Sequence, residues 1–310
     1  MRAEYLKFFK KLLILLVIMI IVDRGLGSIL QYYFENEPLG DAASFAHAIN
    51  DPKEDILIYG SSRAVHTYDT RIFTDSLHLS TYNCGRNGSN VIYGSAILPG
   101  ALDGSKLPKL IILDVFAKEI AYRSSRDGAD MLAAAILPYS LTNPHFESLV
   151  KDLFPKEYVK ARVSKLYAFN SQILSIIRNY SRRHNDNING YQPLHGSKIK
   201  GDPPQFSDRD GIDEYSKGRL EYFVRSVTEK KVPLIVILSP MYNQPFEDNE
   251  SLRVTKEILQ KYNVPFWDYS TDPKYVKAEY FYDAAHLNTK GAEVFSKEIA
   301  SRIKSMGILK

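Results

Sequence analysis

Short continuous apolar runs recur along much of the chain and are separated by segments with a helical pattern. The apolar runs lie at 55–60, 80–84, 110–116, 234–239 and 264–269. The helical patterns occupy 71–77, 90–102, 213–230, 250–262 and 289–306. Apolar runs of this kind are typical of strands that are buried on both faces of a parallel sheet. The pattern therefore predicts an α/β protein with a flavodoxin-like three-layer α/β/α domain and a five-stranded, mostly parallel sheet.

One long segment, at about 124–212, interrupts this alternation. It contains helical stretches at 130–135 and 155–180, followed by the polar sequence RRHNDNINGYQPLHGSKIKGDPP. A segment of this size between two core strands indicates a helical and loop insertion within one domain. We therefore expect the main domain to span 55–310 and to be preceded by a juxtamembrane helical segment at 31–54.

The N-terminal residues 1–30 predict a cytoplasmic tail and a signal anchor. Basic residues at Arg2, Lys7, Lys10 and Lys11 precede the apolar run Leu12–Val22. Basic residues before an apolar run place the N-terminus in the cytoplasm and the main domain outside it. The run itself is shorter than the roughly 20 residues that cross a bilayer, although the apolar residues on either side could lengthen it.

A cleaved signal peptide is the alternative to the anchor. Small residues at Gly25 and Gly27 have the spacing of a cleavage site, and cleavage would release a secreted protein. Asp23 and Arg24 lie awkwardly between the apolar run and that site, which favours an uncleaved, single-pass anchor.

Composition excludes some classes of protein. The net charge is +4, from 40 basic and 36 acidic residues that are scattered along 310 residues, unlike the basic stripe of a nucleic-acid-binding protein. The single cysteine, Cys84, cannot form an intrachain disulfide. His145, His184 and His195 lack metal-ligand spacing, so we expect neither a metal ion nor a cofactor.

Reactive side chains follow three of the predicted strands. Ser61 and Ser62 follow the first strand, and Asp283 and His286 lie beyond the fifth. In an open parallel sheet, ligands bind beyond the carboxyl ends of the strands. Acyl transfer needs a nucleophile, a base and a group that orients the base. We expect Asp283 to hold Nδ1 of His286 so that Nε2 faces a serine, and Gly85, after the second strand, to offer a backbone N–H to an oxyanion.

These short motifs resemble those of one superfamily. Gly60-Ser61-Ser62, Asn83-Cys84-Gly85 and the sequence DAAHLN at 283–288 are similar to three blocks of the SGNH (GDSL-like) hydrolases. The likeness is greatest to their membrane-anchored bacterial branch, which handles acyl groups of cell-envelope polymers, and it covers roughly 55–120 and 230–305. It implies that Ser62 is the nucleophile, that Asp283 and His286 complete a catalytic triad, and that the N–H groups of Ser62 and Gly85 form the oxyanion hole.

Two blocks depart from the family pattern. Ser61 replaces the usual Asp of the first block, as it also does in anchored D-alanyl and O-acetyl transfer relatives. In the third block, Phe116 and Lys118 stand where the family has Gly and an oxyanion-binding Asn. That donor is missing or is supplied from elsewhere, by Asn87 or by the backbone.

Four further residues are weaker candidates. Arg63 and Asp114 are candidate substrate-binding residues, although Arg63 could instead pair with Asp114 in a structural role. His66 lies one helical turn after Ser62, where its reach to the serine Oγ is poor, and Cys84 occupies a place that suits a small buried side chain. We therefore do not expect His66 to be the base, and we do not expect Cys84 to be the nucleophile.

The sequence thus predicts an extracytoplasmic enzyme that transfers or hydrolyses an O-acetyl or similar acyl group on a cell-surface polysaccharide or envelope polymer. The expected partners are an acylated or acyl-accepting glycan and a membrane protein that delivers the acyl donor. The alternative is a non-catalytic envelope protein of SGNH fold that binds glycan or assists polysaccharide assembly.

Overall fold

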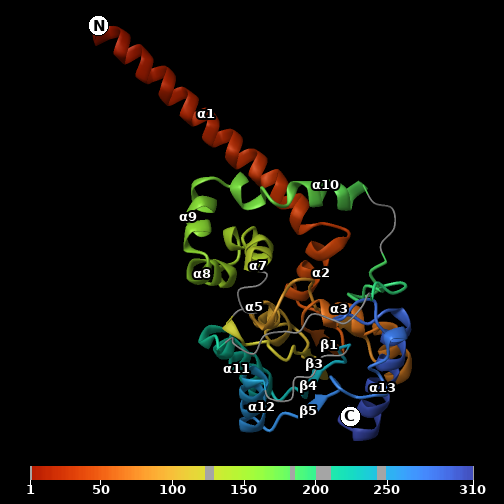
Figure 1. Ribbon diagram of the computed structural model, residues 1–310. Coiled ribbons are helices and arrows are strands. Elements are labelled where there is room, and N and C mark those ends of the chain that lie inside the picture. The colour runs from red at the N-terminus through yellow and green to blue at the C-terminus, as the bar shows by residue number, and fades with distance from the viewer. Residues whose placement is uncertain (1, 123–128, 182–185, 200–210, 243–248, 310) are drawn as a thin grey trace. The chain divides into compact units, whose positions relative to one another are not determined.

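The computed structural model describes residues 2–122, 129–181, 186–199, 211–242 and 249–309 (Figure 1). By its contacts the chain divides into two compact units, one of residues 1–43 and 130–183 and the other of residues 44–129 and 184–310. The predicted insertion therefore contributes to both units.

The larger unit is built on a parallel sheet. Its strands are β1 (Ile56–Tyr59), β2 (Thr81–Asn83), β3 (Leu110–Asp114), β4 (Leu234–Leu238) and β5 (Phe266–Asp268). Within the described residues the sheet has five strands in the order β2-β1-β3-β4-β5, and every neighbouring pair is parallel. This is the flavodoxin-like order, with the chain reversing direction across the sheet between β1 and β3. The predicted α/β fold is confirmed, and every predicted strand is present with slightly narrower bounds.

Helices cover both faces of this sheet. One face carries α5 (Val91–Leu102), α11 (Glu214–Glu229) and α12 (Glu250–Lys261), and the other carries α3 (Ser62–Thr67), α4 (Thr70–Leu77) and α13 (Thr289–Met306). Side chains along β1 alternate between the two faces of the sheet and so contact helices on both sides. Tyr59 meets the ring of Phe223 on α11 at 5.3 Å, whereas Ile58 joins the core that contains Phe295 and Ile299 of α13. The unit thus has three layers.

Asn and Asp side chains fix where these helices begin. Each accepts a backbone N–H from the first turn of its helix, which is the usual N-cap arrangement. The caps are Asp69 for α4, Asn90 for α5, Asp213 for α11, Asn249 for α12 and Asn288 for α13. The cap at Asn288 matters most for function because it starts α13 two residues after His286.

The smaller unit is helical. It contains α1 (Arg2–Glu35), α7 (Ala129–Ile136), α8 (Pro144–Leu153), α9 (Pro155–Val163) and α10 (Ile173–Ser181), with the 3-10 turns η1 (Tyr139–Leu141) and η2 (Leu166–Phe169). Helix α2 (Gly40–Ile49) continues the chain from this unit into the sheet unit. In the core of the helical unit, Phe34 of α1 packs against Tyr139 and Phe169.

The helix that the sequence predicts over 155–180 is broken after Val163. Asp23 of α1 causes the break, because its carboxylate accepts hydrogen bonds from the Ser164 hydroxyl at 2.5 Å and from the Lys165 N–H at 2.8 Å. A carboxylate that binds exposed N–H groups in this way starts a new helical turn. That turn is η2.

Helix α1 is longer than the predicted apolar run. It has 34 residues, and within the described chain it is the one helix long and apolar enough to cross a membrane. The hydrophobic side chains from Leu12 to Val22 are all exposed.

Candidate active site

A tight turn after β1 presents Ser62 at the edge of the sheet. Gly60 has φ = +152°, and a Cβ atom there would lie 2.8 Å from both the Ala64 Cβ and the Asp114 carbonyl oxygen. Glycine is therefore required for the chain to leave the strand in this direction. Ser61 follows as the N-cap of α3, accepting the Arg63 N–H at 3.3 Å. Serine and aspartate are both good N-cap residues, so Ser61 can start the helix as well as the Asp that SGNH hydrolases usually have in this block.

The structure brings Ser62, His286 and Asp283 together. The Ser62 Oγ lies 2.7 Å from Nε2 of His286. Nδ1 of the same ring lies 2.9 Å from Oδ1 and 3.0 Å from Oδ2 of Asp283. A carboxylate only accepts, so Nδ1 carries the proton and Nε2 is left to accept from the serine. This is the hydrogen-bond order of a serine hydrolase triad.

Backbone groups also hold the Asp283 carboxylate. Its Oδ1 accepts the N–H of Ala285 at 2.9 Å and the N–H of His286 at 3.0 Å. Burial raises the pKa of Asp283, but hydrogen bonds and the charge of His286 lower it further than burial raises it, so the net pKa of Asp283 is lowered. Asp283 is therefore ionised at neutral pH, as the orienting acid must be.

A second histidine lies beside the first. The rings of His66 and His286 meet edge to face with centroids 5.4 Å apart. Nδ1 of His66 lies 2.7 Å from the carbonyl oxygen of Gln192 and so donates to it. Burial lowers the pKa of His66, and the neighbouring His286 adds to this. His66 is thus a neutral neighbour of the candidate base.

Gln192 completes this side of the site and was not predicted from the sequence. Its N–H donates to Val65 O at 3.0 Å, and its side-chain oxygen accepts from Asn87 at 3.3 Å. The side chain of Asn87 lies close enough to His66 to raise the pKa of that imidazole, against the larger effect of burial. Gln192 comes from the polar part of the predicted insertion, which has no motif that would single it out.

Gly85 does not offer the free N–H that the sequence predicts. Its N–H donates to Oδ1 of Asn83 at 3.0 Å. A Cβ atom at residue 85 would lie 2.9 Å from the same oxygen and 3.0 Å from the Ala64 Cβ. Gly85 therefore allows the loop after β2 to approach α3 closely, and in this conformation its N–H is bonded to Asn83. The role of Gly85 as an oxyanion donor stays a prediction.

Ser62 and Asn87 are the other oxyanion candidates. Ser62 is the first residue of α3, so its N–H has no acceptor within the helix. Asn87 is half-buried and close to His66, but its amide already contacts Gln192. The Ser62 amide is therefore the better placed donor.

Arg63 and Asp114 form a buried pair beneath the serine. Nε of Arg63 lies 3.5 Å from Oδ1 of Asp114, and the exposed fractions of the two side chains are 5% and 0%. Nη2 of Arg63 donates to the backbone oxygen and to the Oγ of Ser239 at 2.6 Å each, and Tyr68 OH donates to Asp114 at 2.7 Å. These contacts join the ends of β3 and β4 to α3. The burial and pairing of Arg63 and Asp114 favour the structural role, and substrate binding by these two residues stays a prediction.

A carboxylate occupies the region where the family has its third block. Glu119 is buried, and its oxygens accept the N–H of Val91, at the start of α5, and the N–H of Phe116 at 2.9 Å. Burial raises its pKa from the ordinary 4.5 to about 7. Lys118, aligned with the family's Asn, is also buried. This segment supports the sheet edge rather than the oxyanion.

The remaining candidates are excluded from the chemistry. Cys84 is 1% exposed, and burial raises the pKa of its thiol far above the usual range, so the thiolate that a nucleophile needs does not form. Among the residues that the structure describes, no group of three His, Cys, Asp or Glu side chains is placed to hold a metal ion.

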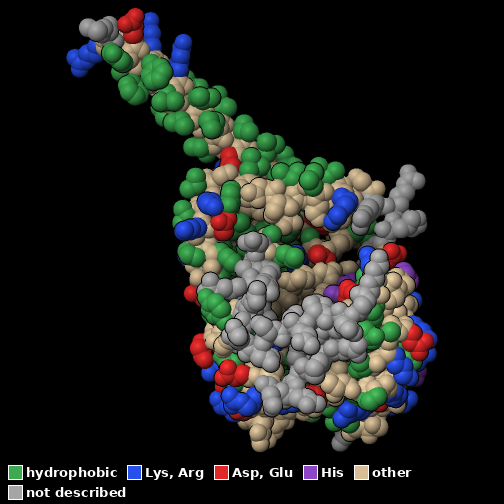
Figure 2. All heavy atoms as spheres, viewed as in Figure 1, with side chains coloured by type: hydrophobic (Ala, Val, Ile, Leu, Met, Phe, Trp, Pro, Cys, Tyr) green, Lys and Arg blue, Asp and Glu red, His purple; other side chains and the backbone are tan. Residues whose placement is uncertain are grey.

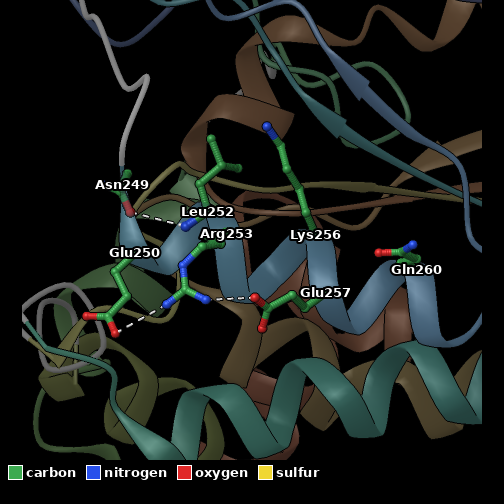
Figure 3. Close-up of a pocket in the computed structure, with 7 residues that line it drawn as sticks. All are labelled: Asn249, Glu250, Leu252, Arg253, Lys256, Glu257 and Gln260. Atoms are coloured by element: carbon green, nitrogen blue, oxygen red, sulfur yellow. Dashed lines mark hydrogen bonds and ion pairs between the residues drawn. The ribbon is translucent and has the colours of Figure 1, made fainter.

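A hollow of about 520 Å³ lies away from the triad, along α12 (Figure 3). Its lining residues all belong to that helix and its N-cap. Arg253 contacts Glu257 at 2.7 Å and Glu250 at 3.7 Å, so the charges are paired along the helix. We assign this hollow no role.

Comparisons with known proteins give likenesses to solved structures alone. No model of a protein family matches the sequence, and no curated protein matches it. The chain is similar to the esterase EstA from Pseudoalteromonas sp., with 10% identity and a TM-score of 0.42 over 81% of this chain and 97% of that one. It is also similar to a GDSL-like lipase from Bacteroides thetaiotaomicron, with 10% identity and a TM-score of 0.37 over 81% and 88% of the two chains.

A third likeness is to a family two carbohydrate esterase from Clostridium thermocellum, with 8% identity and a TM-score of 0.35 over 82% of this chain and 65% of that one. All three TM-scores lie below 0.5.

Proposed function

We propose that this chain, whose sheet order and hydrogen-bonded Ser62, His286 and Asp283 have the arrangement of an SGNH (GDSL-like) hydrolase, is a serine-dependent esterase or acyltransferase. The observation that carries the proposal is the unbroken path from Ser62 Oγ through the imidazole of His286 to the carboxylate of Asp283. Ser62 lies more than 220 residues before Asp283 and His286 in the chain, so local sequence alone does not bring the serine to the other two.

The first half of the reaction forms an acyl-enzyme. Ser62 Oγ attacks the carbonyl carbon of the ester while its proton passes to Nε2 of His286. Asp283 stabilises the imidazolium, and the Ser62 N–H donates to the oxyanion. The tetrahedral intermediate then breaks its bond to the alcohol oxygen, and His286 gives its proton to that oxygen.

The second half transfers the acyl group to water or to a sugar hydroxyl. The acceptor loses its proton to Nε2 of His286 as its oxygen attacks the acyl carbon, and the proton then returns to Ser62 Oγ. Water yields a free carboxylic acid, and a sugar hydroxyl yields a new ester. The same residues serve both outcomes, so access of the acceptor decides between them.

The proposed substrate is an O-acetyl or similar acyl group on a cell-surface polysaccharide or envelope polymer. The resemblance to anchored bacterial acyl-transfer enzymes supports this choice, as does helix α1. Its basic residues and exposed apolar surface suit a single-pass anchor in the bacterial cytoplasmic membrane, with the sheet unit on the extracytoplasmic side. A membrane protein that delivers the acyl donor is part of this proposal.

A fluorophosphonate probe tests the nucleophile. We expect the folded protein to be modified at Ser62, as located by mass spectrometry, and the Ser62→Ala variant to lose both labelling and hydrolysis of activated acetyl esters. Ser61→Ala is the matched control, because it removes the neighbouring hydroxyl and costs about 1 kcal/mol of N-cap stabilisation but leaves the nucleophile. Full activity of Ser62→Ala would refute the assignment.

A non-catalytic role is the second candidate. The observation in its favour is that Gly85 N–H is bonded to Asn83 and that the third block lacks its Asn, which leaves few oxyanion donors. On this alternative the unit binds glycan or assists polysaccharide assembly. An unmodified Ser62 in folded protein, together with glycan binding that survives Ser62→Ala, would favour it. Mass spectrometry of Ser62 after incubation with acyl donors, with and without glycan acceptors, separates hydrolysis from transfer.

A further inference from the structure

Helix α10 of the helical unit exposes a row of large apolar side chains. Leu174 is 81% exposed and Ile177 is 58% exposed, and Ile173 and Tyr180 lie on the same side of the helix. Ile176, on the other side, is 5% exposed and packs inward. The helix is thus apolar on both sides, whereas a helix that faces water is polar on its outer side.

Two neighbouring segments of the same unit have the same property. Val159 and Val163 of α9 are four residues apart and are 58% and 75% exposed. Leu26 and Ile29, in the later turns of α1, are 49% and 54% exposed. Figure 2 shows hydrophobic side chains along α1 and over the adjoining helices of this unit. We call these six side chains, Leu26, Ile29, Val159, Val163, Leu174 and Ile177, the apolar shelf.

Contacts to α1 hold the shelf in place. Tyr180 OH of α10 donates to Asn36 O at 2.7 Å, and its ring meets that of Tyr33 at 5.3 Å. At the end of α9, Arg24 donates to Arg162 O at 2.9 Å and to Val163 O at 3.2 Å. Helices α9 and α10 are therefore both tied to the segment of α1 that follows its most apolar stretch.

Helix α1 is too long for the hydrocarbon layer alone. Its 34 residues rise about 51 Å, whereas the hydrocarbon core of a bilayer is about 30 Å thick. Hydrophobic side chains stay exposed on α1 well beyond Val22, at Leu26, Ile29, Tyr32 and Tyr33. Tyrosine is enriched at the membrane interface, and a hydrophobic stretch that exceeds the hydrocarbon layer is accommodated by tilting, so we expect the last turns of α1 to lie in the interface.

We propose that the apolar shelf lies in the interface of the membrane that α1 crosses, so that α9 and α10 rest on the bilayer at the level of the lipid headgroups. The inference depends on the membrane anchor of the proposed function. The charge of α9 fits anionic headgroups, because Lys156, Lys160 and Arg162 outnumber its one acidic residue, Glu157. An exposed apolar surface of this extent is unfavourable in water and is favourable at a lipid surface.

Site-directed fluorescence on the full-length chain tests this proposal. The single cysteine, Cys84, is buried with a raised thiol pKa, so a cysteine introduced at an exposed position is labelled selectively. The nitrobenzoxadiazole dye is attached to Leu174→Cys or Ile177→Cys in vesicles of phosphatidylcholine and phosphatidylglycerol that contain a lipid spin-labelled near the headgroup. We expect quenching at both positions at least threefold stronger than at Asp152→Cys, an exposed control on α8 of the same unit.

A label at Ile14→Cys, in the middle of the apolar part of α1, separates failure of the shelf from failure of the anchor. Its emission should be quenched by a lipid that carries the spin label deep in the acyl chain. If Ile14 is quenched but Leu174 and Ile177 behave like Asp152, the shelf faces water or a protein partner and the proposal is wrong. If Ile14 is not quenched, the anchor and the shelf both fail, whereas labelling of Ser62 still decides the catalytic proposal independently.

Discussion

Replacement of Asp283 by Asn separates the charge of the orienting acid from its geometry. Three hydrogen bonds converge on one oxygen, Oδ1, which accepts from Ala285 N, from His286 N and from Nδ1 of His286. An Asn side chain keeps this oxygen. It has one favourable orientation, because the flipped amide would turn its NH₂ group towards two backbone N–H groups. We therefore expect Asp283→Asn to keep the contacts of Oδ1 and to lose the negative charge, while its NH₂ group replaces the acceptor Oδ2 that lies 3.0 Å from Nδ1 of His286.

The size of the charge effect follows from the distance. Two unit charges about 3 Å apart interact by about 5 kcal/mol at an effective dielectric constant of 20 and by about 1.4 kcal/mol in bulk water. The Asp283 side chain is 42% exposed, so the value for this pair lies between these limits, at about 2–4 kcal/mol. Because about 1.4 kcal/mol corresponds to a factor of ten in rate, kcat should fall by a factor of about 30 to 1,000.

The assay is hydrolysis of a small activated acetyl ester at neutral pH. Asp283→Ala, which removes the oxygen as well as the charge, should lose more activity than Asp283→Asn. Glu279→Gln is the control for a nearby exposed carboxylate, since Glu279 pairs with Lys290 rather than with the triad, and it should leave kcat unchanged. Equal losses in the Asn and Ala variants, or a loss below fivefold in both, would refute the reasoning.

Two further predictions concern the free energy of unfolding of the sheet unit, measured by unfolding in urea. The probe is the fluorescence of the single tryptophan, Trp267, which is buried in β5. Burial raises the pKa of Glu119 to about 7, so the folded protein keeps a proton that the unfolded chain releases above about pH 4.5. The contribution of this bound proton to the free energy of unfolding is complete below about pH 4.5 and is lost as the pH rises to about 7. Glu119→Gln has no such proton, so its stability relative to wild type should improve by about 3 kcal/mol between pH 4.5 and 7.5; a difference that does not change with pH contradicts the raised pKa. At Gly190 (φ = +87°), a Cβ atom would lie 1.8 Å from the Asn83 carbonyl oxygen, so Gly190→Ala should destabilise by at least 3 kcal/mol. Gly196→Ala, with φ = +79° and no atom within 4 Å, should cost only about 1–2 kcal/mol of backbone strain; similar losses in both variants would show that the close approach to Asn83 is unimportant.

Local patterns in the sequence were enough to predict the sheet and the residues that meet at its edge. Buried parallel strands are continuous apolar runs, and the residues just after them converge because the carboxyl ends of the strands share one edge. Asp283 and His286 are three residues apart in one turn, so their contact is a local property. The contact of His286 with Ser62 is not given by the order of strands, because β3 and β4 separate β1 from β5; it accompanies the packing of α13 against α3. The catalytic role of these residues stays a prediction.

The remaining features depend on contacts that no local pattern records. Arg63 follows the candidate nucleophile directly, yet its guanidinium turns inward to Asp114 and Ser239, which come from two other strands. Gly85 has the right residue type for an oxyanion donor, but its N–H is bonded to Asn83, two residues earlier. Gln192 reaches the site from a segment with no recognisable motif, and the break after Val163 requires a carboxylate from position 23. The contacts of Arg63, Gln192 and Asp23 depend on partners that only the folded chain brings close, whereas the Gly85 contact depends on the local conformation of the loop after β2.

The spacing of Ser62 and His286 along the chain also has a consequence for biosynthesis. Asn288 starts α13 directly after the candidate base, and α13 packs against α3, which begins with Ser62. A ribosome must therefore add more than 220 residues after the serine before its base exists, and the base is not positioned until α13 docks. We expect a nascent chain to remain unreactive towards esters until this last helix is in place, so that acylation of Ser62 reports completed folding.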